Sequence, residues 1–245
     1  MIRFHLKKAF FDGWDHVVPL MVINLLYLVI PGALVLVYIN EPVNTPLGIA
    51  AMMTALLLSV FFYTGVSGIT FQWSKYNRTW VKDFFQAIRE KAGHALVLFV
   101  LLAVMTAVFL YVPYFLSLGN VLYMGLTMLV FWIFFFALLA LQFYLPLAFY
   151  IKADGPVKTL KKSFILLSDN IAFSAWMFVK TLADIALSVV SATLAPGICG
   201  ISLSHMDGLR LVLIRYNYTE KHPGCNRREL DWKDVFSAEA RELGR

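Results

Sequence analysis

Long apolar blocks, rather than alternating apolar and polar positions, dominate this sequence. Each block is close to or above the roughly 20 residues that an α-helix needs to cross a ~30 Å hydrocarbon core. A transmembrane β-barrel would instead show short alternating segments. The blocks therefore predict an all-α polytopic membrane protein, a single domain over residues 1–216. Its six spans are expected at about residues 17–39, 47–73, 94–118, 121–151, 171–195 and 198–216.

Composition supports this class of protein. The chain has 245 residues, of which 60% are hydrophobic and 15% charged. An ordinary soluble domain is about half apolar and about a quarter charged, so this chain cannot supply a soluble surface. Its two cysteines, Cys199 and Cys225, are expected near opposite membrane faces and therefore as free thiols.

The distribution of the 21 Lys and Arg residues predicts the orientation. None lies in the first, third or fifth connection, and one, Lys180, lies inside the fifth span. Cationic loops stay in the cytoplasm, so both termini and the tail 217–245 are expected there, in the cell (cytoplasmic or inner) membrane. The net charge of +6 is thus a topology signal and does not indicate nucleic acid. The other cations are Arg3, Lys7, Lys8, Lys75, Arg78, Lys82, Arg89, Lys91, Lys152, Lys158, Lys161, Lys162, Arg210, Arg215, Lys221, Arg227, Arg228, Lys233, Arg241 and Arg245.

The connections predict three membrane hairpins. The outer connections are short and rich in turn residues, so spans one and two, three and four, and five and six should pair. An amphipathic helix is expected ahead of each hairpin. At the N-terminus, Ile2, Leu6 and Phe10 oppose Arg3, Lys7 and Lys8. This order suggests a threefold repeat, although any three membrane hairpins would look alike.

The two inner connections carry the clearest amphipathic patterns. Apolar residues recur there at helical spacing, with charged residues on the opposite face. Such helices lie on lipid headgroups or dock a partner, and both interpretations stay open. The residues expected to dock a membrane or a protein partner are Val81, Phe84, Phe85, Ile88, Val157, Leu160 and Phe164.

Ionisable residues inside spans five and six are candidates for function, because charge at membrane depth is costly unless it is paired or hydrated. Lys180 and Asp184 are four residues apart and should share a helix face. A relay or substrate site is one interpretation, and a neutral network that fixes the hairpin is the other. Asn24 in the first span is expected to form an interhelical hydrogen bond beside a proline bend. The expected intramembrane polar network is Lys180, Asp184, His205, Asp207, Arg210 and Asn24.

The sequence contains no pattern typical of an enzyme. It lacks a phosphate-binding loop, a G-x-S-x-G motif, an HExxH motif and any His, Cys, Asp and Glu group with metal-ligand spacing. We therefore expect no catalytic residue, no metal and no cofactor. The expected partners are the lipid bilayer and another membrane or cytoplasmic protein subunit.

Four short stretches resemble the YesL-like family of uncharacterised bacterial membrane proteins. They are Asn24-Leu-Leu-Tyr-Leu-Val-Ile-Pro31, Trp80-Val-Lys-Asp-Phe-Phe-Gln-Ala-Ile88, Leu145-Pro146 through Thr159-Leu-Lys-Lys-Ser-Phe164, and Ala195-Pro-Gly197. The resemblance implies a non-enzymatic accessory or scaffold component of a carbohydrate ABC-type transport system, and it transfers no site residues. The alternative is a transporter or an ion- or proton-coupled permease that uses the charged residues of spans five and six.

Overall fold

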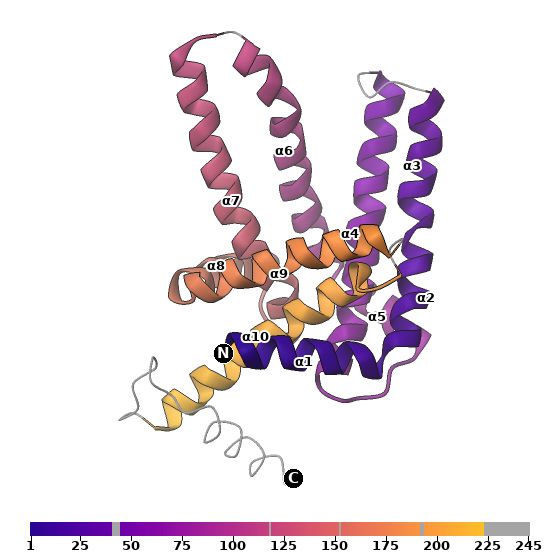
Figure 1. The fold of residues 1–245 in the computed structure, drawn as a ribbon, viewed down its shortest axis with the longest axis vertical. Coiled ribbons are helices and arrows are strands. Elements are labelled where there is room, and N and C mark those ends of the chain that lie inside the picture. Colours follow the sequence, from indigo (N-terminus) through magenta and orange to yellow (C-terminus); the bar gives the residue numbers. More distant parts are fainter. Residues whose placement is uncertain (41–44, 118, 152, 192–193, 223–245) are drawn as a thin grey trace.

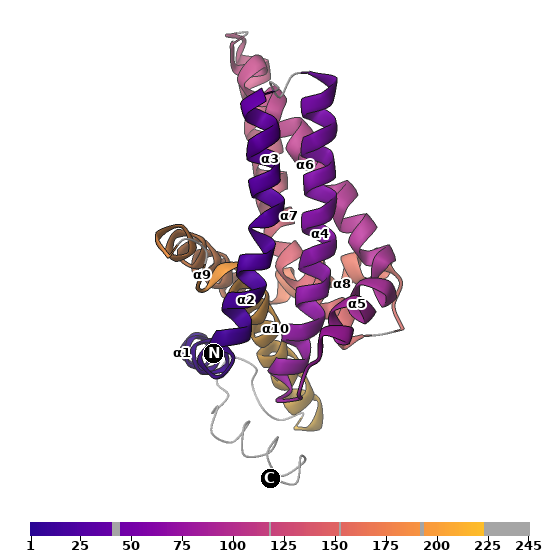
Figure 2. The ribbon, with the colours of Figure 1, turned by 90° about the vertical axis from the view of Figure 1, so that its right-hand side faces the viewer.

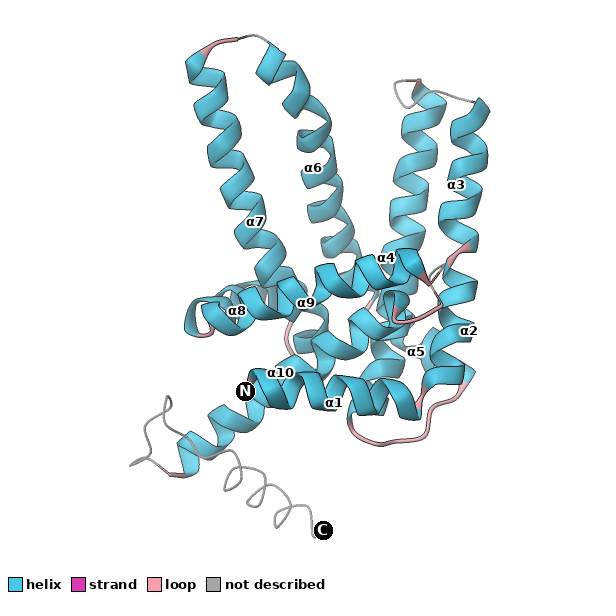
Figure 3. Ribbon diagram, viewed as in Figure 1, coloured by secondary structure: helices cyan, strands magenta, loops and turns pink. Residues whose placement is uncertain are grey.

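The computed structural model describes residues 1–40, 45–117, 119–151, 153–191 and 194–222. Every regular element in these ranges is a helix (Figure 3). In chain order they are α1 (Ile2–Asp15), α2 (Val17–Tyr27), α3 (Val29–Asn40), α4 (Pro46–Ser74), α5 (Val81–Glu90), α6 (Ala92–Ser117), α7 (Val121–Tyr150), α8 (Pro156–Asp169), α9 (Ile171–Val190) and α10 (Gly197–Lys221) (Figure 1).

Six helical segments among the described residues are long and apolar enough to cross a membrane, as expected for a multi-pass membrane protein. The predicted boundaries hold to within two residues for the second, third and fourth spans. The fifth helix ends earlier than predicted, at Val190, and the sixth runs past residue 216 to Lys221. Most of the predicted tail, and Cys225 with it, lies outside the described residues.

The first span is made of two helices, with a break at Leu28. Pro31 has no N–H to donate to the carbonyl four residues earlier, so the helical ladder is interrupted there. Backbone hydrogen bonds of the α-helical type nevertheless continue across the break. Leu28 N donates to Asn24 O at 3.3 Å, and Gly32 N donates to Leu28 O at 3.0 Å. This is the proline bend expected in the first span.

Two upright hairpins and a base of crossing helices make up the molecule. In Figure 1 the first hairpin, α2 and α3 with α4, stands beside the second, α6 with α7. Helices α1, α8 and α9 run across beneath them, and in Figure 2 α1 and α9 are seen nearly end-on. We call α1, α5, α8, α9 and α10 the base. The pair α9 and α10 therefore differs from the other two pairs, because α9 is not aligned with the upright hairpins.

The buried core lies in the basal half of the molecule. Buried residues of α7 run from Leu139 to Phe149, and those of α4, apart from Gly48, begin at Val60. Towards their far ends the hairpins expose large apolar side chains, such as Val35 and Val121. Lipid chains solvate such side chains, so the far ends need no protein neighbour, whereas the base is packed like the interior of a soluble protein.

Helix α5 packs into a notch on α4. A Cβ atom added at Gly68 would overlap the Cβ of Ala87, and one added at Gly65 would overlap the ring of Phe84. Two glycines one turn apart let the helices approach more closely than any side chain would allow. The contact places α5 beneath the first hairpin.

Helices are present at all three expected places, and the apolar faces of α5 and α8 are divided between buried and exposed side chains. On α5, Phe84 is half-buried against α4, whereas Phe85 and Val81 are 64% and 76% exposed. On α8, Val157 and Phe164 are exposed and Leu160 is half-buried. One part of each predicted docking face thus holds the helix to the bundle, and another part points outward. Ile88 is half-buried.

We predict that Gly68→Ala destabilises the protein. The new methyl group must displace α5, which costs about 1–3 kcal/mol for an overpacked contact. A lower thermal unfolding temperature in detergent would show this. The matched control is Gly125→Ala on α7, where an added Cβ meets nothing within 4 Å; equal unfolding temperatures for the two variants would contradict the notch.

Candidate functional site

Asn24 on α2 caps the start of α10. Its side-chain Nδ2 donates to the carbonyls of Leu194 and Pro196 at 3.0 and 2.9 Å, and its Oδ1 accepts from Cys199 N at 3.0 Å. The amide thereby satisfies a backbone N–H that the first turn of α10 leaves without a helical partner. Gly197 has a φ of +57° and lies against this amide, so a side chain there would be both strained and obstructed. The expected interhelical hydrogen bond of Asn24 is therefore present, and its role is to join α2 to α10.

A polar seam joins α4 to α10 along the buried contact between them. Ser202 on α10 lies 3.1 Å from the hydroxyl of Ser67 and 2.9 Å from that of Thr70. One turn along α10, His205 Nδ1 is 3.1 Å from the hydroxyl of Tyr63. Residues 63, 67, 70 and 74 share one face of α4, because three- and four-residue steps return to the same side of a helix. Hydrogen bonds of this kind let a polar helix be buried among apolar ones.

The charged residues of α9 form their own pair. Lys180 Nζ lies 2.6 Å from Asp184 Oδ2, with side chains 14% and 10% exposed. His205 connects α10 to this helix, since its Nε2 is 3.0 Å from the hydroxyl of Thr181. The pairing expected from the four-residue spacing is present.

Helix α1 turns a polar stripe inward, and its predicted apolar residues Ile2, Leu6 and Phe10 are exposed. His5 is fully buried, Asp12 is 4% exposed and the Lys8 side chain 15% exposed. These positions follow helical spacing and form one stripe. Lys8 therefore lies on the inward face of α1. Phe10 and Trp14, at 65% and 66% exposed, occupy the outer face instead.

Lys8 bridges two carboxylates from different helices. Its Nζ forms an ion pair with Asp12 and lies 3.2 Å from Asp207 Oδ1 on α10. Asp207 is completely buried. Lys8 Nζ is close enough to Asp207 Oδ1 for an ion pair, but the geometry of this contact is not that of a hydrogen bond. Burial alone would lower the pKa of Lys8, but Asp207 and Asp12 outweigh it and raise that pKa above its ordinary value. Lys8 thus compensates charge that would otherwise be uncompensated inside the base.

Arg210 on α10 contacts the end of α4 and the turn that follows it. Its guanidinium donates to the backbone carbonyl of Ser74 at the end of α4 and lies 5.5 Å from the ring of Tyr76. Tyr76 has a φ of +61°, a conformation that is unusual for a residue with a side chain. The turn places the Tyr76 hydroxyl 3.3 Å from Lys8 Nζ. Cation–π contact and the helix C-terminus both favour a positive charge at this point. We call Lys8, Asp12, Tyr76, Asp207 and Arg210 the polar junction.

The six residues expected to form one intramembrane network fall into separate local sets. Asn24 caps α10, Lys180 pairs with Asp184, His205 joins α4 to α9, and Asp207 and Arg210 belong to the polar junction. Asp184 accepts from Lys180, whereas Arg210 donates to the Ser74 carbonyl, so these two residues belong to different sets.

Sequence reasoning missed His5, Asp12, Tyr63 and Tyr76. For α1 a signal was available, because His5, Lys8 and Asp12 are spaced by three and four residues. The roles of Tyr63 and Tyr76 depend on which helices meet, and the linear pattern carries no such information. Among the residues that the structure describes, no cluster of three or more His, Cys, Asp and Glu could hold a metal ion.

We predict that His5 makes stability depend on pH. Burial is the main reason that its pKa is lowered, to about 4, although Nε2 is 2.9 Å from the carbonyl oxygen of Ser204. The unfolded chain binds a proton near pH 6.5 and the native state near pH 4. The contribution of neutral His5 to the free energy of unfolding is therefore fully present above pH 6.5. It is lost as the pH falls from about 6.5 to about 4, by at most about 1.4 kcal/mol per pH unit.

Unfolding in detergent as a function of pH measures this loss. His5→Gln keeps a donor for the Ser204 carbonyl and cannot titrate, so it should flatten the curve over that pH range. His222→Gln alters an exposed histidine and should keep the wild-type curve. Identical curves for wild type and His5→Gln would contradict the prediction.

Comparison with known proteins does not identify the site. No protein-family model, no curated protein and no solved structure matches this chain. A function therefore has to rest on the geometry of the polar groups and on the outward faces of the base.

Proposed function

We propose that this protein is a non-enzymatic accessory or scaffold component of a membrane transport system, in the cytoplasmic membrane of a bacterium. The observation that carries the proposal is that each of the helices α1, α5 and α8, which precede the spans, exposes large apolar side chains. Trp14 on α1, Phe85 on α5 and Val157 on α8 are 66%, 64% and 63% exposed. Side chains of this kind, on short helices across the base, suit a surface that binds a protein subunit.

The proposed orientation places the N-terminal helix α1 and the interfacial helices α5 and α8 on the cytoplasmic side. The basic connections are those that join the helices of the base, and the outer connections contain no Lys or Arg. Both termini are then cytoplasmic. In this arrangement α9 and α10 form the third membrane pair, tilted relative to the other two. The assignment to a carbohydrate ABC-type system comes from the resemblance to the YesL-like family.

Local pairing of the buried charges supports a structural role for them. Lys180 has Asp184 as its partner, Asp207 has Lys8, and Arg210 has a backbone carbonyl. A proton or ion path through the membrane needs ionisable groups in successive layers, usually along water. Charges that are each paired on a neighbouring turn or helix are better suited to holding α1, α9 and α10 in place than to conducting protons or ions.

We predict that a benzophenone amino acid at position 85 crosslinks one protein of fixed mass in native membranes. The matched control is position 131 on the upright part of α7, where Phe131 is 51% exposed and should meet lipid. Mass spectrometry of the adduct should identify a transport-system subunit at position 85 and lipid at position 131. Lipid adducts alone at both positions would mean that the base lies on headgroups, and would contradict the proposal.

We predict that removing one member of the Lys180–Asp184 pair destabilises the protein and that removing both restores it. Lys180→Met or Asp184→Leu leaves a buried charge without its partner, at a cost of up to about 3 kcal/mol, whereas the double variant leaves none. Unfolding in detergent gives the change in the free energy of unfolding for the two single variants and for the double variant. Proton flux into proteoliposomes provides the second measurement: a flux in wild type that the folded double variant lacks would favour the permease instead.

A further inference from the structure

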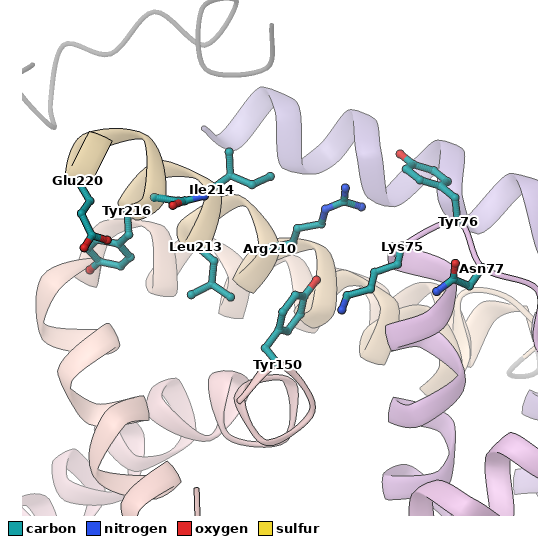
Figure 4. A pocket seen from close by; sticks show the side chains of 10 residues that line it. Lys75, Tyr76, Asn77, Tyr150, Arg210, Leu213, Ile214, Tyr216 and Glu220 are labelled. Carbon is teal, nitrogen blue, oxygen red and sulfur yellow. The ribbon is translucent and has the colours of Figure 1, made fainter. Parts of the chain in front are cut away.

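The cavity beside the polar junction, of about 730 Å³, has its arginine engaged by the protein itself. Arg210 extends from α10 to the turn after α4 (Figure 4). There it donates to the Ser74 carbonyl, and its guanidinium carbon lies 5.5 Å from the ring centroid of Tyr76. It also interacts electrostatically with the buried Asp207. The charge of Arg210 therefore stabilises the contact between α4 and α10.

Another cavity, of about 570 Å³, lies where the start of α1 meets the junction of α8 with α9 and the second half of α10. Its volume is in the range of small-ligand sites. The charged side chains of its lining are Arg3, Asp169 and Arg215, and the amide of Asn170 lies among them. Arginines from two helices thus reach the same cavity.

Arg215 brings a cation to this cavity without an anionic partner. Its guanidinium donates to Oδ1 of Asn170, and its Nη1 lies 3.9 Å from the sulfur of Met1, a weak acceptor. Its Cζ lies 5.8 Å from the ring centroid of Tyr216, a contact that does not neutralise charge. Within the described part of the chain, its buried Nε has no hydrogen-bond partner, and no carboxylate forms an ion pair with Arg215 or Arg3.

Asn170 fixes the position of the Arg215 guanidinium. Its amide is 6% exposed, and Nδ2 donates to the Leu166 carbonyl and to the Tyr216 hydroxyl, both at 3.0 Å. These two bonds identify the nitrogen, so the oxygen is the atom that accepts from Arg215. A guanidinium that is already held in place loses less conformational entropy when it binds an anion.

The first turn of α9 adds partial positive charge to the cavity. Residues 171–173 line it, and the side chain of Asn170, which binds Arg215, makes no capping bond to this turn. The first N–H groups of a helix have no partner within the helix, and together with the helix dipole they favour an anion. The last carbonyls of α8 are turned to the protein, since Leu166 O and Leu167 O both accept from Asn170.

Asp169 brings one negative charge to the lining. Its carboxylate accepts from the hydroxyl of Tyr216 at 3.0 Å. Because two arginines stand against this one carboxylate, the charged side chains leave an excess of one positive charge. An anion with a single negative charge would neutralise the cavity.

Apolar side chains lie beside these charges. Ile2 and Ile171 both line the cavity and are 42% and 54% exposed. Ile171 is also the first residue of a candidate span, so the cavity lies at the level of lipid headgroups. A ligand with a charged head and an apolar chain suits this arrangement.

We propose that this cavity binds a phosphate group with a single negative charge, as in the diester of an anionic phospholipid. The phosphate oxygens accept from Arg215 and Arg3 and face the first turn of α9, while the acyl chains pass Ile2 and Ile171. Guanidinium groups suit phosphate because their N–H donors match its oxygens. Inorganic phosphate offers the same oxygens without the chains. The site is separate from the outward faces that carry the proposed scaffold function, and it does not rest on that function.

Calorimetric titration of the full chain in an uncharged detergent tests the site. The probes are dihexanoyl-phosphatidylglycerol, the zwitterionic dihexanoyl-phosphatidylcholine and inorganic phosphate. Wild type should bind the phosphatidylglycerol more tightly than the phosphatidylcholine. Arg215→Gln should weaken phosphatidylglycerol binding by about tenfold, the effect of losing one charge-assisted hydrogen bond. Arg3→Gln removes an exposed charge and should weaken it by about twofold.

A third variant should shift the affinity in the opposite direction. Asp169→Asn keeps an acceptor for the Tyr216 hydroxyl and removes the one negative charge, so binding should tighten by about twofold. Damage to the fold would not produce tighter binding. The matched control, Arg89→Gln, removes an exposed arginine on α5 outside the cavity and should bind as wild type does.

The outcomes separate the source of the ligand from the existence of the site. Binding of phosphatidylglycerol but not of inorganic phosphate identifies a membrane lipid, and equal binding of inorganic phosphate identifies a water-soluble ligand. No binding of either to folded wild type would overturn the proposal. So would phosphatidylcholine binding as tightly as phosphatidylglycerol, or affinities that Arg215→Gln and Asp169→Asn leave unchanged. If Arg215→Gln does not fold, the opposite shifts of Arg3→Gln and Asp169→Asn decide the matter.

Discussion

The burial of helix α10 is the constraint on which the rest of the structure depends. Among the described residues it is the least apolar of the six candidate spans, with a mean hydropathy of 1.3, and it is also the most buried. It carries Asp207 and Arg210, which lipid would not tolerate without partners. Three of the helices that touch it contribute polar groups to it: α2 the Asn24 amide, α4 the hydroxyls of the seam, and α1 the Lys8 ammonium. The base is built around this one polar helix.

The same constraint explains the unusual orientation of α1. An interfacial helix normally turns its charges to water and its apolar side chains to lipid or protein. Here the stripe of His5, Lys8 and Asp12 faces α10, because a carboxylate there needs a cation. The aromatic side chains of α1 are left on the outside. An outward apolar face is thus a consequence of the internal electrostatics, and it is the feature on which the proposed binding of a partner rests.

The molecule consists of two regions that are stabilised by different interactions. The far ends of the upright hairpins expose apolar residues, and their helical backbone bonds are satisfied internally, so they are stable in lipid with few protein contacts. The base contains the charge pairs and the close glycine contacts. The proposed function accordingly rests on the outward faces of the base.

The linear pattern predicted the class of protein, the six candidate spans and the helices α1, α5 and α8, because length and hydropathy are local properties of the chain. It also indicated the Lys180–Asp184 pair and an interhelical bond for Asn24. The course of α9 across the hairpins, the inward position of Lys8 and the polar contacts of Tyr63 and Tyr76 follow instead from how the helices pack. These depend on which faces of distant helices meet, such as α1 with α10 or α4 with α5. Apolar spans have no periodic pattern that marks the face buried against protein, so the linear order of residues does not contain that choice.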